Sequence, residues 1–92
     1  MRVAELRCDD RAEEHIWERH RLTFREVEEA FYHHGWGIRG REKGIYEIYG
    51  RTEAGRYLMI AARSLAKGVF QLITARDMSH AERRRYGKHT AH

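Results

Sequence analysis

The sequence predicts an α+β domain in which two N-terminal helices pack on an antiparallel β-meander of three to four strands, followed by a short C-terminal helix. Helix-start signals and helically spaced apolar residues occupy the first third of the chain. The apolar period changes to two between residues 45 and 76, as expected for strands. A chain of 92 residues has room for one core, so residues 1–92 are expected to form a single domain.

Three helix starts can be recognised from their capping residues. Thr23 and Glu26 have the spacing of a capping box, and Phe24, Val27, Ala30 and Phe31 follow at helical intervals. The first helix begins with an aspartate followed by a glutamate, and the third with a serine followed three residues later by a glutamate. The predicted helices run from Asp10 to about His20, from Thr23 to about Tyr32–Gly35, and from Ser79 through Tyr86.

Three strand-like runs lie between the second and third helices. Two short glycine-containing loops, Glu53–Gly55 and Ala66–Gly68, join them as successive hairpins. A weaker strand is expected in the glycine-rich stretch Trp36–Arg41. The three main strands are predicted at Ile45–Thr52, Arg56–Leu65 and Val69–Arg76.

Simple hairpin registers divide these strands into two faces, because successive side chains point to opposite sides of a sheet. One face is almost wholly apolar and should pack under the helices, whereas the other mixes aromatic residues with arginines. The expected apolar face is Tyr46, Ile48, Gly50, Leu58, Ile60, Ala62, Val69, Gln71, Ile73 and Ala75. The expected opposite face is Ile45, Glu47, Tyr49, Arg51, Tyr57, Met59, Ala61, Arg63, Phe70, Leu72, Thr74 and Arg76.

The arginines of the second face suggest a phosphate site. In this register Arg51, Tyr57 and Arg76 lie side by side at one end of the sheet. Two arginines can hold a phosphate while the ring between them offers a stacking surface. The alternative is that these arginines are solvated or paired with Glu47, Asp77 or Glu82. A one-residue slip in either hairpin would also separate them.

Composition limits the other possibilities. Residues 1–34 hold six basic and nine acidic residues, whereas residues 35–92 hold twelve basic and five acidic residues. The basic part favours a polyanion or an acidic protein as partner, although a solvated charged surface is the plain alternative. A lone cysteine, no apolar run long enough to span a bilayer and no secretion signal together predict a cytoplasmic protein without disulfides or a membrane.

No metal site or cofactor is expected. The histidines lack the spacing of zinc ligands, and the glycines do not form a phosphate-binding loop. His20 shares a helix stripe with Ala12 and Ile16, which is typical of a partly buried structural histidine and also permits a catalytic one. The run Arg83-Arg84-Arg85 forms a basic patch on the last helix, or simply its solvated end.

Several motifs together resemble BrnT-family toxins. The resemblance covers about residues 9–88, and its closing motif is the most specific part. Arg21 stands where the family carries a glycine after the histidine, and Gly44–Ile45 stands where many members carry Glu-Arg. The matching motifs are Arg19-His20 with Thr23-Phe24-Arg25-Glu26 and Ala30-Phe31; Tyr49-Gly50-Arg51-Thr52 with Gly55-Arg56-Tyr57-Leu58; and Ile73-Thr74-Ala75-Arg76 with Ser79, Glu82-Arg83-Arg84 and Tyr86.

This resemblance implies a RelE-like ribonuclease fold and metal-independent cleavage of RNA. It implies further that a cognate BrnA-type antitoxin neutralises the toxin, and that the complex binds operator DNA only through the antitoxin. The expected activity is an endoribonuclease toxin of a bacterial type II toxin–antitoxin module that inhibits translation. The alternatives are a non-catalytic RNA-binding module and a basic protein-interaction domain on the same scaffold.

Metal-independent cleavage needs a base for the 2′-hydroxyl, cations for the phosphate and an acid for the leaving oxygen. The resemblance supports four of the candidate residues, namely His20, Arg51, Arg76 and Tyr86, whereas the others rest on the face argument or on the basic patch. Arg51 and Arg76 are predicted to hold the phosphate, and His20 or Glu47 to carry the proton. Tyr57 or Tyr86 would stack or orient the substrate. The predicted catalytic residues are His20, Arg51, Arg76, Glu47 and Tyr86, and the predicted nucleic-acid-binding residues are Tyr57, Arg63, Arg83 and Arg84.

Overall fold

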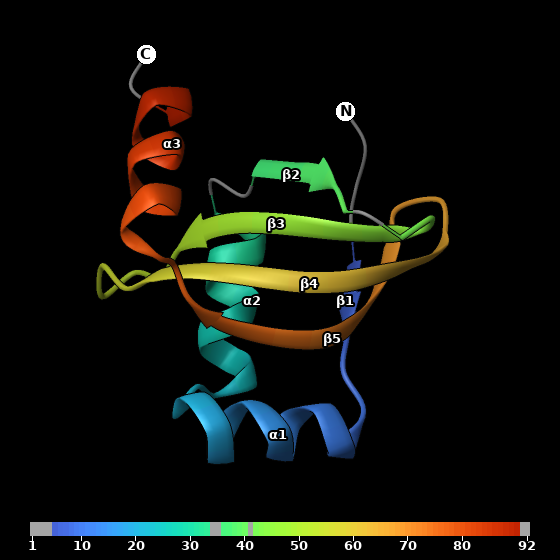
Figure 1. Ribbon diagram of the computed structural model, residues 1–92. Helices are drawn as coiled ribbons and strands as arrows, with labels where there is room; N and C mark the ends of the chain where they lie inside the picture. Colours follow the sequence, from blue (N-terminus) through green and yellow to red (C-terminus); the bar gives the residue numbers. More distant parts are fainter. Residues whose placement is uncertain (1–4, 34–35, 41, 91–92) are drawn as a thin grey trace.

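A five-stranded sheet organises the described part of the chain, and two helices cover one of its faces (Figure 1). The computed structural model describes residues 5–33, 36–40 and 42–90. Arg41, the end of the expected weak strand, lies outside these residues. The elements in chain order are β1 (Glu5–Arg7), α1 (Asp10–His20), α2 (Phe24–Tyr32), β2 (Trp36–Arg39), β3 (Ile45–Arg51), β4 (Tyr57–Ala66), β5 (Val69–Asp77) and α3 (His80–Thr90).

The predicted α+β architecture is confirmed, with one strand added. The sheet order is β1-β5-β4-β3-β2, and β2 to β5 form the expected antiparallel meander. β1 was not predicted; it pairs in parallel with β5, so that Leu6 lies opposite Phe70. A three-residue strand with a single buried side chain has no alternation to reveal it, and its partner lies far away in the sequence.

The capping signals place the helices as expected, with small shifts. Asp9 rather than Asp10 caps α1, since its carboxylate accepts the Ala12 N–H at 2.8 Å. The Thr23–Glu26 capping box is present in full at the start of α2. α3 begins after Ser79 as predicted but continues to Thr90 rather than ending at Tyr86.

The register of β3 and β4 is the predicted one, whereas that of β5 changes part-way along the strand. Arg76 lies opposite Met59 and Thr74 opposite Ala61, as expected. A bulge follows, after which Leu72 rather than Ile73 lies opposite Ala62. The prediction for the first half of β5 was therefore wrong: Leu72 and Phe70 face the helices, and Ile73 is exposed.

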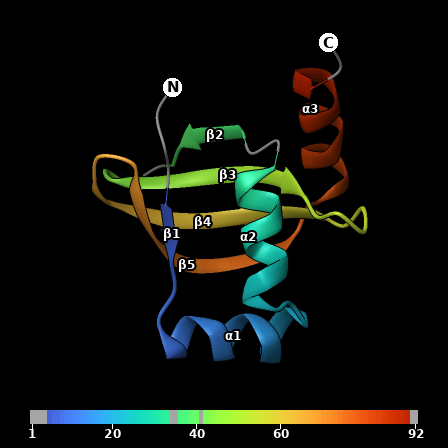
Figure 2. The same cartoon turned by 180° about the vertical axis from the view of Figure 1, so that it is seen from behind.

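The main core lies between the sheet and the first two helices. Figure 2 shows α2 crossing this face of the sheet. At the crossing, the Cα of Gly50 lies so close to the Ala30 carbonyl that a Cβ on Gly50 would collide with it. The buried core residues on this side include Leu6, Ala12, Ile16, Leu22, Val27, Ala30, Ile48, Leu58, Ile60, Ala62, Leu72 and Ala75.

The opposite face is partly covered by α3. Tyr86 of α3 packs with Tyr49, Met59 and Met78 in a second, smaller buried cluster. No helix was predicted to cover this face, but α3 lies against it at the end where β3 finishes (Figure 1). None of the described helices is long and apolar enough to cross a membrane.

Candidate nucleic-acid interface

One aromatic ring at the end of the sheet is flanked by two arginines. Tyr57 opens β4 directly opposite Arg51, the last residue of β3. The guanidinium carbon of Arg51 lies 5.8 Å from the centroid of the Tyr57 ring, and that of Arg83, from α3, lies 4.4 Å away. These three residues, called the Tyr57 cluster below, unite two arginines that lie far apart in the sequence.

The charges of the Tyr57 cluster are not neutralised within the described part of the chain. Neither Arg51 nor Arg83 forms an ion pair with a described carboxylate, whereas Arg7, Arg56 and Arg76 do. Hydrogen bonding to Arg51, followed by its charge and by Arg83, lowers the pKa of the Tyr57 hydroxyl below its usual value of 10. The cluster can therefore bind an anion and offers a phenol that ionises more readily than usual.

Arg76 lies on the same face as Arg51, as predicted, but it has an internal partner. Its guanidinium donates two hydrogen bonds to the Glu82 carboxylate, at 2.8 and 2.9 Å. Hydrogen bonding to Arg76 lowers the pKa of Glu82 to about 2. Because Glu82 also accepts the Ser79 N–H at 2.8 Å, this ion pair fixes the first turn of α3 to β5. The alternative that a site arginine is paired with Glu82 thus holds for Arg76 and not for Arg51.

Tyr86 packs against the Tyr57 ring. Its side chain is buried, and its ring meets the Tyr57 ring edge to face with centroids 6.0 Å apart. Burial raises the pKa of the Tyr86 hydroxyl. Tyr86 is therefore placed to orient Tyr57 and α3 rather than to stack on a substrate.

Glu47 takes part in a hydrogen-bonded chain beside the Tyr57 cluster. The Tyr49 hydroxyl donates to the Glu47 carboxylate at 2.8 Å, and Arg85 donates to the Tyr49 oxygen at 3.3 Å. Burial and the hydrogen bond to Glu47 raise the pKa of Tyr49 to about 12. Tyr49 was placed on this face and Arg85 in the basic patch, but neither was predicted as a catalytic or binding residue, since nothing in the sequence indicates that α3 approaches β3.

His20 is not brought to the Tyr57 cluster. It ends α1, on the helix-covered side of the sheet, and its ring meets the His15 ring at a centroid distance of 6.0 Å. Its backbone carbonyl accepts a hydrogen bond from Arg56 at 3.0 Å. The catalytic role predicted for His20 rests on the family resemblance, and no contact to the arginines of the other face supports it.

Arg56 has a denser set of partners than any predicted site residue, and sequence reasoning did not single it out. Its guanidinium donates to both carboxylate oxygens of Asp77, at 2.7 and 3.0 Å, and to the Arg21 carbonyl at 3.1 Å. Glu26 of α2 adds an ion pair at 3.6 Å. Arg56 therefore joins the end of the sheet to the junction between the first two helices, which is a structural role.

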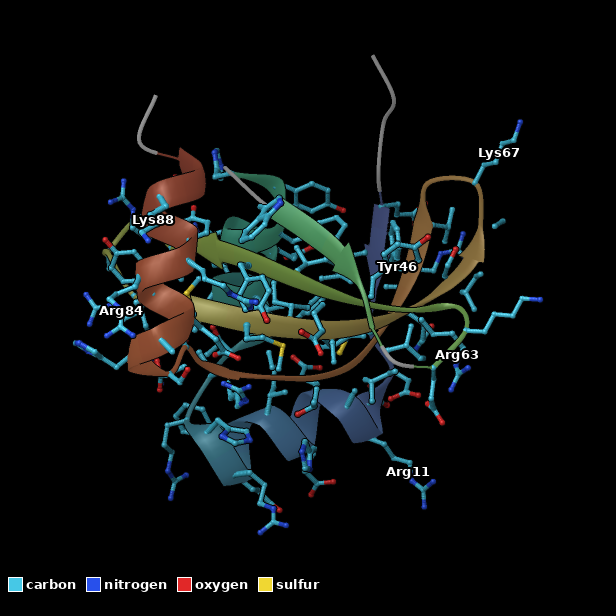
Figure 3. The ribbon with its side chains drawn as sticks, turned by 45° about the horizontal axis from the view of Figure 1, so that its top comes forward. Arg11, Tyr46, Arg63, Lys67, Arg84 and Lys88 are labelled. Atoms are coloured by element: carbon cyan, nitrogen blue, oxygen red, sulfur yellow. The ribbon has the colours of Figure 1, made fainter. Side chains whose placement is uncertain are left out.

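The remaining predicted binding residues lie at different places. Arg63 lies opposite Ile45, at the far end of the sheet from α3. Figure 3 shows Arg63 and Lys67 at that end, and Arg84 and Lys88 projecting outward from α3. Arg84 thus adds positive charge to the outer side of α3, whereas Arg63 is remote from the Tyr57 cluster. No group of three or more potential metal ligands occurs among the residues described.

Comparison with known proteins shows a likeness in fold. No family model matches the sequence, and no curated protein does. Among solved structures, the fold is similar to that of the ribonuclease toxin BrnT from Brucella abortus, with a TM-score of 0.67 and 11% sequence identity. The likeness covers 85% of this chain and 100% of the toxin chain. At this identity the comparison shows a shared α+β fold.

Proposed function

We propose that the chain is a metal-independent endoribonuclease toxin of a bacterial type II toxin–antitoxin module, acting in the cytoplasm and neutralised by a BrnA-type antitoxin. The Tyr57 cluster is the observation that carries this proposal. Two arginines without carboxylate partners in the described structure flank a tyrosine of lowered pKa, and RNA supplies both the phosphate and the base that such a cluster accommodates. The fold shared with a ribonuclease toxin supports the same reading.

The proposed reaction needs no metal. In the proposed step, the phenolate form of Tyr57 accepts the proton of the 2′-hydroxyl, and the 2′-oxygen attacks the adjacent phosphorus. The bond to the 5′-oxygen breaks, water protonates that oxygen, and a 2′,3′-cyclic phosphate remains. Arg51 and Arg83 stabilise the charge that builds on the phosphate. Arg76 acts mainly by holding α3. Arg83 therefore takes the phosphate-binding role that the sequence suggested for Arg76.

One observation favours a second candidate, a non-catalytic RNA-binding module. Arg76 is engaged by Glu82, and neither His20 nor Glu47 contacts the Tyr57 cluster through a described bond. Such a module would keep the arginines and need no proton carrier. For the toxin, the antitoxin would supply the contacts to operator DNA.

Cleavage of a short RNA by the purified chain in the presence of EDTA tests the proposal. We expect products ending in 2′,3′-cyclic phosphate, and no cleavage where the 2′-hydroxyl is replaced by hydrogen. Tyr57→Phe should slow cleavage and leave binding of the 2′-deoxy analogue unchanged. Binding without cleavage would establish the RNA-binding module instead, and absence of salt-dependent RNA binding would leave a protein-interaction domain.

Expression in bacteria tests the biological role. We expect the chain alone to arrest growth and lower translation, and co-expression of the adjacent gene to reverse both effects. Normal growth with intact messenger RNA at high expression would contradict a toxin function.

A further inference from the structure

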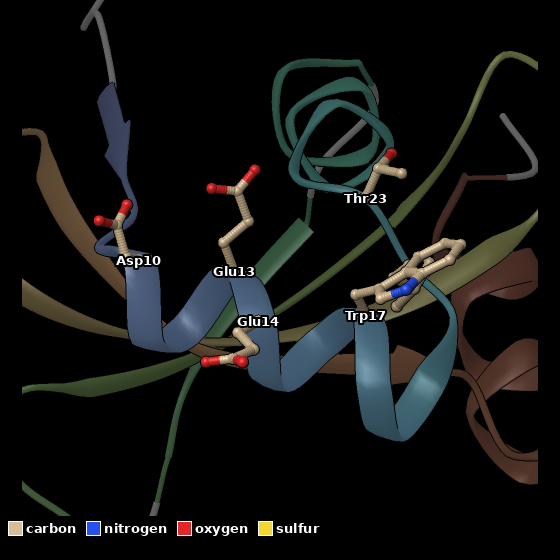
Figure 4. A pocket seen from close by; sticks show the side chains of 6 residues that line it. Asp10, Glu13, Glu14, Trp17 and Thr23 are labelled. Atoms are coloured by element: carbon tan, nitrogen blue, oxygen red, sulfur yellow. The ribbon is translucent and has the colours of Figure 1, made fainter.

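An open groove runs along α1 (Figure 4). Its volume is about 620 Å³, and most of its surface is apolar. It begins near the start of α1 and ends where the chain turns into α2. The groove, called the α1 groove below, is lined by Asp10, Glu13, Glu14, Trp17, Leu22 and Thr23.

The helical repeat explains why acidic and aromatic residues meet in this groove. Ala12 and Ile16 point into the core, so the neighbouring stripe of α1 must face outward. That stripe carries three carboxylates followed by Trp17, whose side chain is 49% exposed. The Arg21 guanidinium lies 5.3 Å from the Trp17 ring centroid and holds the ring in place at the end of the groove.

The carboxylates of the α1 groove are not neutralised within the described structure. Asp10, Glu13 and Glu14 form no ion pair with a described basic side chain. Their field extends to the neighbouring Cys8: burial and then the charges of Glu13 and nearby aspartates raise the pKa of that thiol to about 11. The groove therefore repels nucleic acid and attracts a cation that also carries apolar surface.

We propose that the α1 groove binds a basic amphipathic segment of a partner protein, with an apolar side chain against Trp17 and lysine or arginine side chains facing Glu13 and Glu14. Exposed tryptophans are frequent anchors of protein interfaces, and charge complementarity selects the basic partner. This surface lies apart from the Tyr57 cluster and does not depend on the proposed RNA cleavage. The molecule then presents an acidic surface to a protein and a basic surface to RNA.

Titration with synthetic peptides tests the assignment. The probes are two lysine–leucine peptides, one with helical and one with alternating apolar spacing, and the same peptides with glutamate in place of lysine. We expect a lysine peptide to shift the indole N–H resonance of Trp17 saturably, and added salt to weaken binding. The glutamate peptides should leave Trp17 unchanged. Fluorescence of a Trp36→Phe variant, in which Trp17 is the remaining indole, gives an independent readout.

Charge-matched variants identify the surface. Glu13→Gln with Glu14→Gln should weaken peptide binding about tenfold, whereas Glu18→Gln with Glu53→Gln removes the same charge elsewhere and should leave binding unchanged. RNA binding and cleavage should be the same in both variants. The proposal is overturned if no lysine peptide shifts Trp17, if the glutamate peptides bind equally well, or if the groove instead mediates self-association that Trp17→Ala abolishes.

Discussion

Arg51 and Arg56 lie at the same end of the sheet, on opposite faces, and their surroundings differ sharply. On the helix-covered face, Arg56 binds Asp77, two backbone carbonyls and Glu26. On the other face, Arg51 contacts the ring of Tyr57 and no described carboxylate. The difference separates an arginine whose charge is used by the fold from one whose charge is left for a ligand.

The charges next to Arg56 and Arg51 explain why the two arginines have different roles. Asp77 balances the charge of Arg56, and the pKa of Asp77 is lowered by its hydrogen bonds to Arg56. Arg83 instead places a second positive charge next to Arg51, on the same ring. Two like charges at one site repel each other, so a bound phosphate would stabilise both arginines. Substitutions on the two faces should consequently affect different properties.

The largest effect is expected in catalysis, on the Tyr57 face. Arg51→Ala should cost about 2–4 kcal/mol of transition-state stabilisation, or roughly 30- to 900-fold in kcat/KM, because a preorganised charge is lost from the phosphate. Arg83→Ala should have a similar effect, and the double substitution should cost less than the sum because the two act on one group. Single-turnover cleavage of a short RNA measures these losses.

Thermal unfolding supplies the control for this prediction. Exposed arginines without ion pairs contribute little to folding, so the melting temperature of both variants should stay near that of the parent. Arg11→Ala removes an exposed arginine from α1 and should change neither cleavage nor stability. If Arg51→Ala and Arg83→Ala both cleave RNA as fast as the parent, the proposed functional difference between Arg51 and Arg56 is wrong.

The next largest effect is expected in stability, on the helix-covered face. Arg56→Ala should lower the free energy of unfolding by about 1–2 kcal/mol, since several charge-assisted hydrogen bonds are lost from a partly exposed site. Denaturant unfolding measures this loss. Cleavage per folded molecule should be retained, and a variant that stays stable but loses activity would place Arg56 in the reaction instead.

Glu82 should make the fold sensitive to acid. Its pKa of about 2 lies below the ordinary value of 4.5, so its contribution is fully present above pH 4.5 and is lost as the pH falls towards 2. The free energy of unfolding of the parent should fall in this window by about 1 kcal/mol more than that of Glu82→Gln, allowing for the partial exposure of Arg76. Parallel pH curves for the two proteins would show that the Arg76–Glu82 pair contributes nothing to folding.

Much of the fold could be predicted because its signals are local. The Thr23 and Ser79 capping boxes fix two helix starts, and the alternation around Tyr57 fixes the face that it shares with Arg51. The change of register within β5 could not be predicted, because a bulge depends on packing against β4 and β1 rather than on an alternation that continues through Ile73.

The site was predicted less completely than the fold, because its contacts join distant segments. Strand register alone places Arg51 beside Tyr57, but the approach of Arg83 depends on how Tyr86 packs α3 against Met59. Likewise nothing local shows that Glu82 binds Arg76. Arg56 was not singled out for the same reason, since its partners come from the end of α1, from α2 and from β5.

The smallest effect concerns Arg21, whose carbonyl is one of the acceptors of Arg56. Arg21 ends α1 with φ 52° and ψ 45°, the left-handed conformation that favours glycine. Arg21→Gly should relieve this strain, at a partial loss from the missing contact to Trp17, and so raise the free energy of unfolding by about 0.5–1 kcal/mol. Arg21→Ala keeps the strain and loses the contact to the Trp17 ring, so it should be slightly less stable than the parent.

Denaturant unfolding of the parent and the two variants distinguishes the strain from the ring contact. Equal stabilities of the glycine and alanine variants would show that the left-handed turn costs nothing here. Cleavage should be unchanged in both variants, because the carbonyl that Arg56 binds belongs to the backbone and is kept whichever side chain is present.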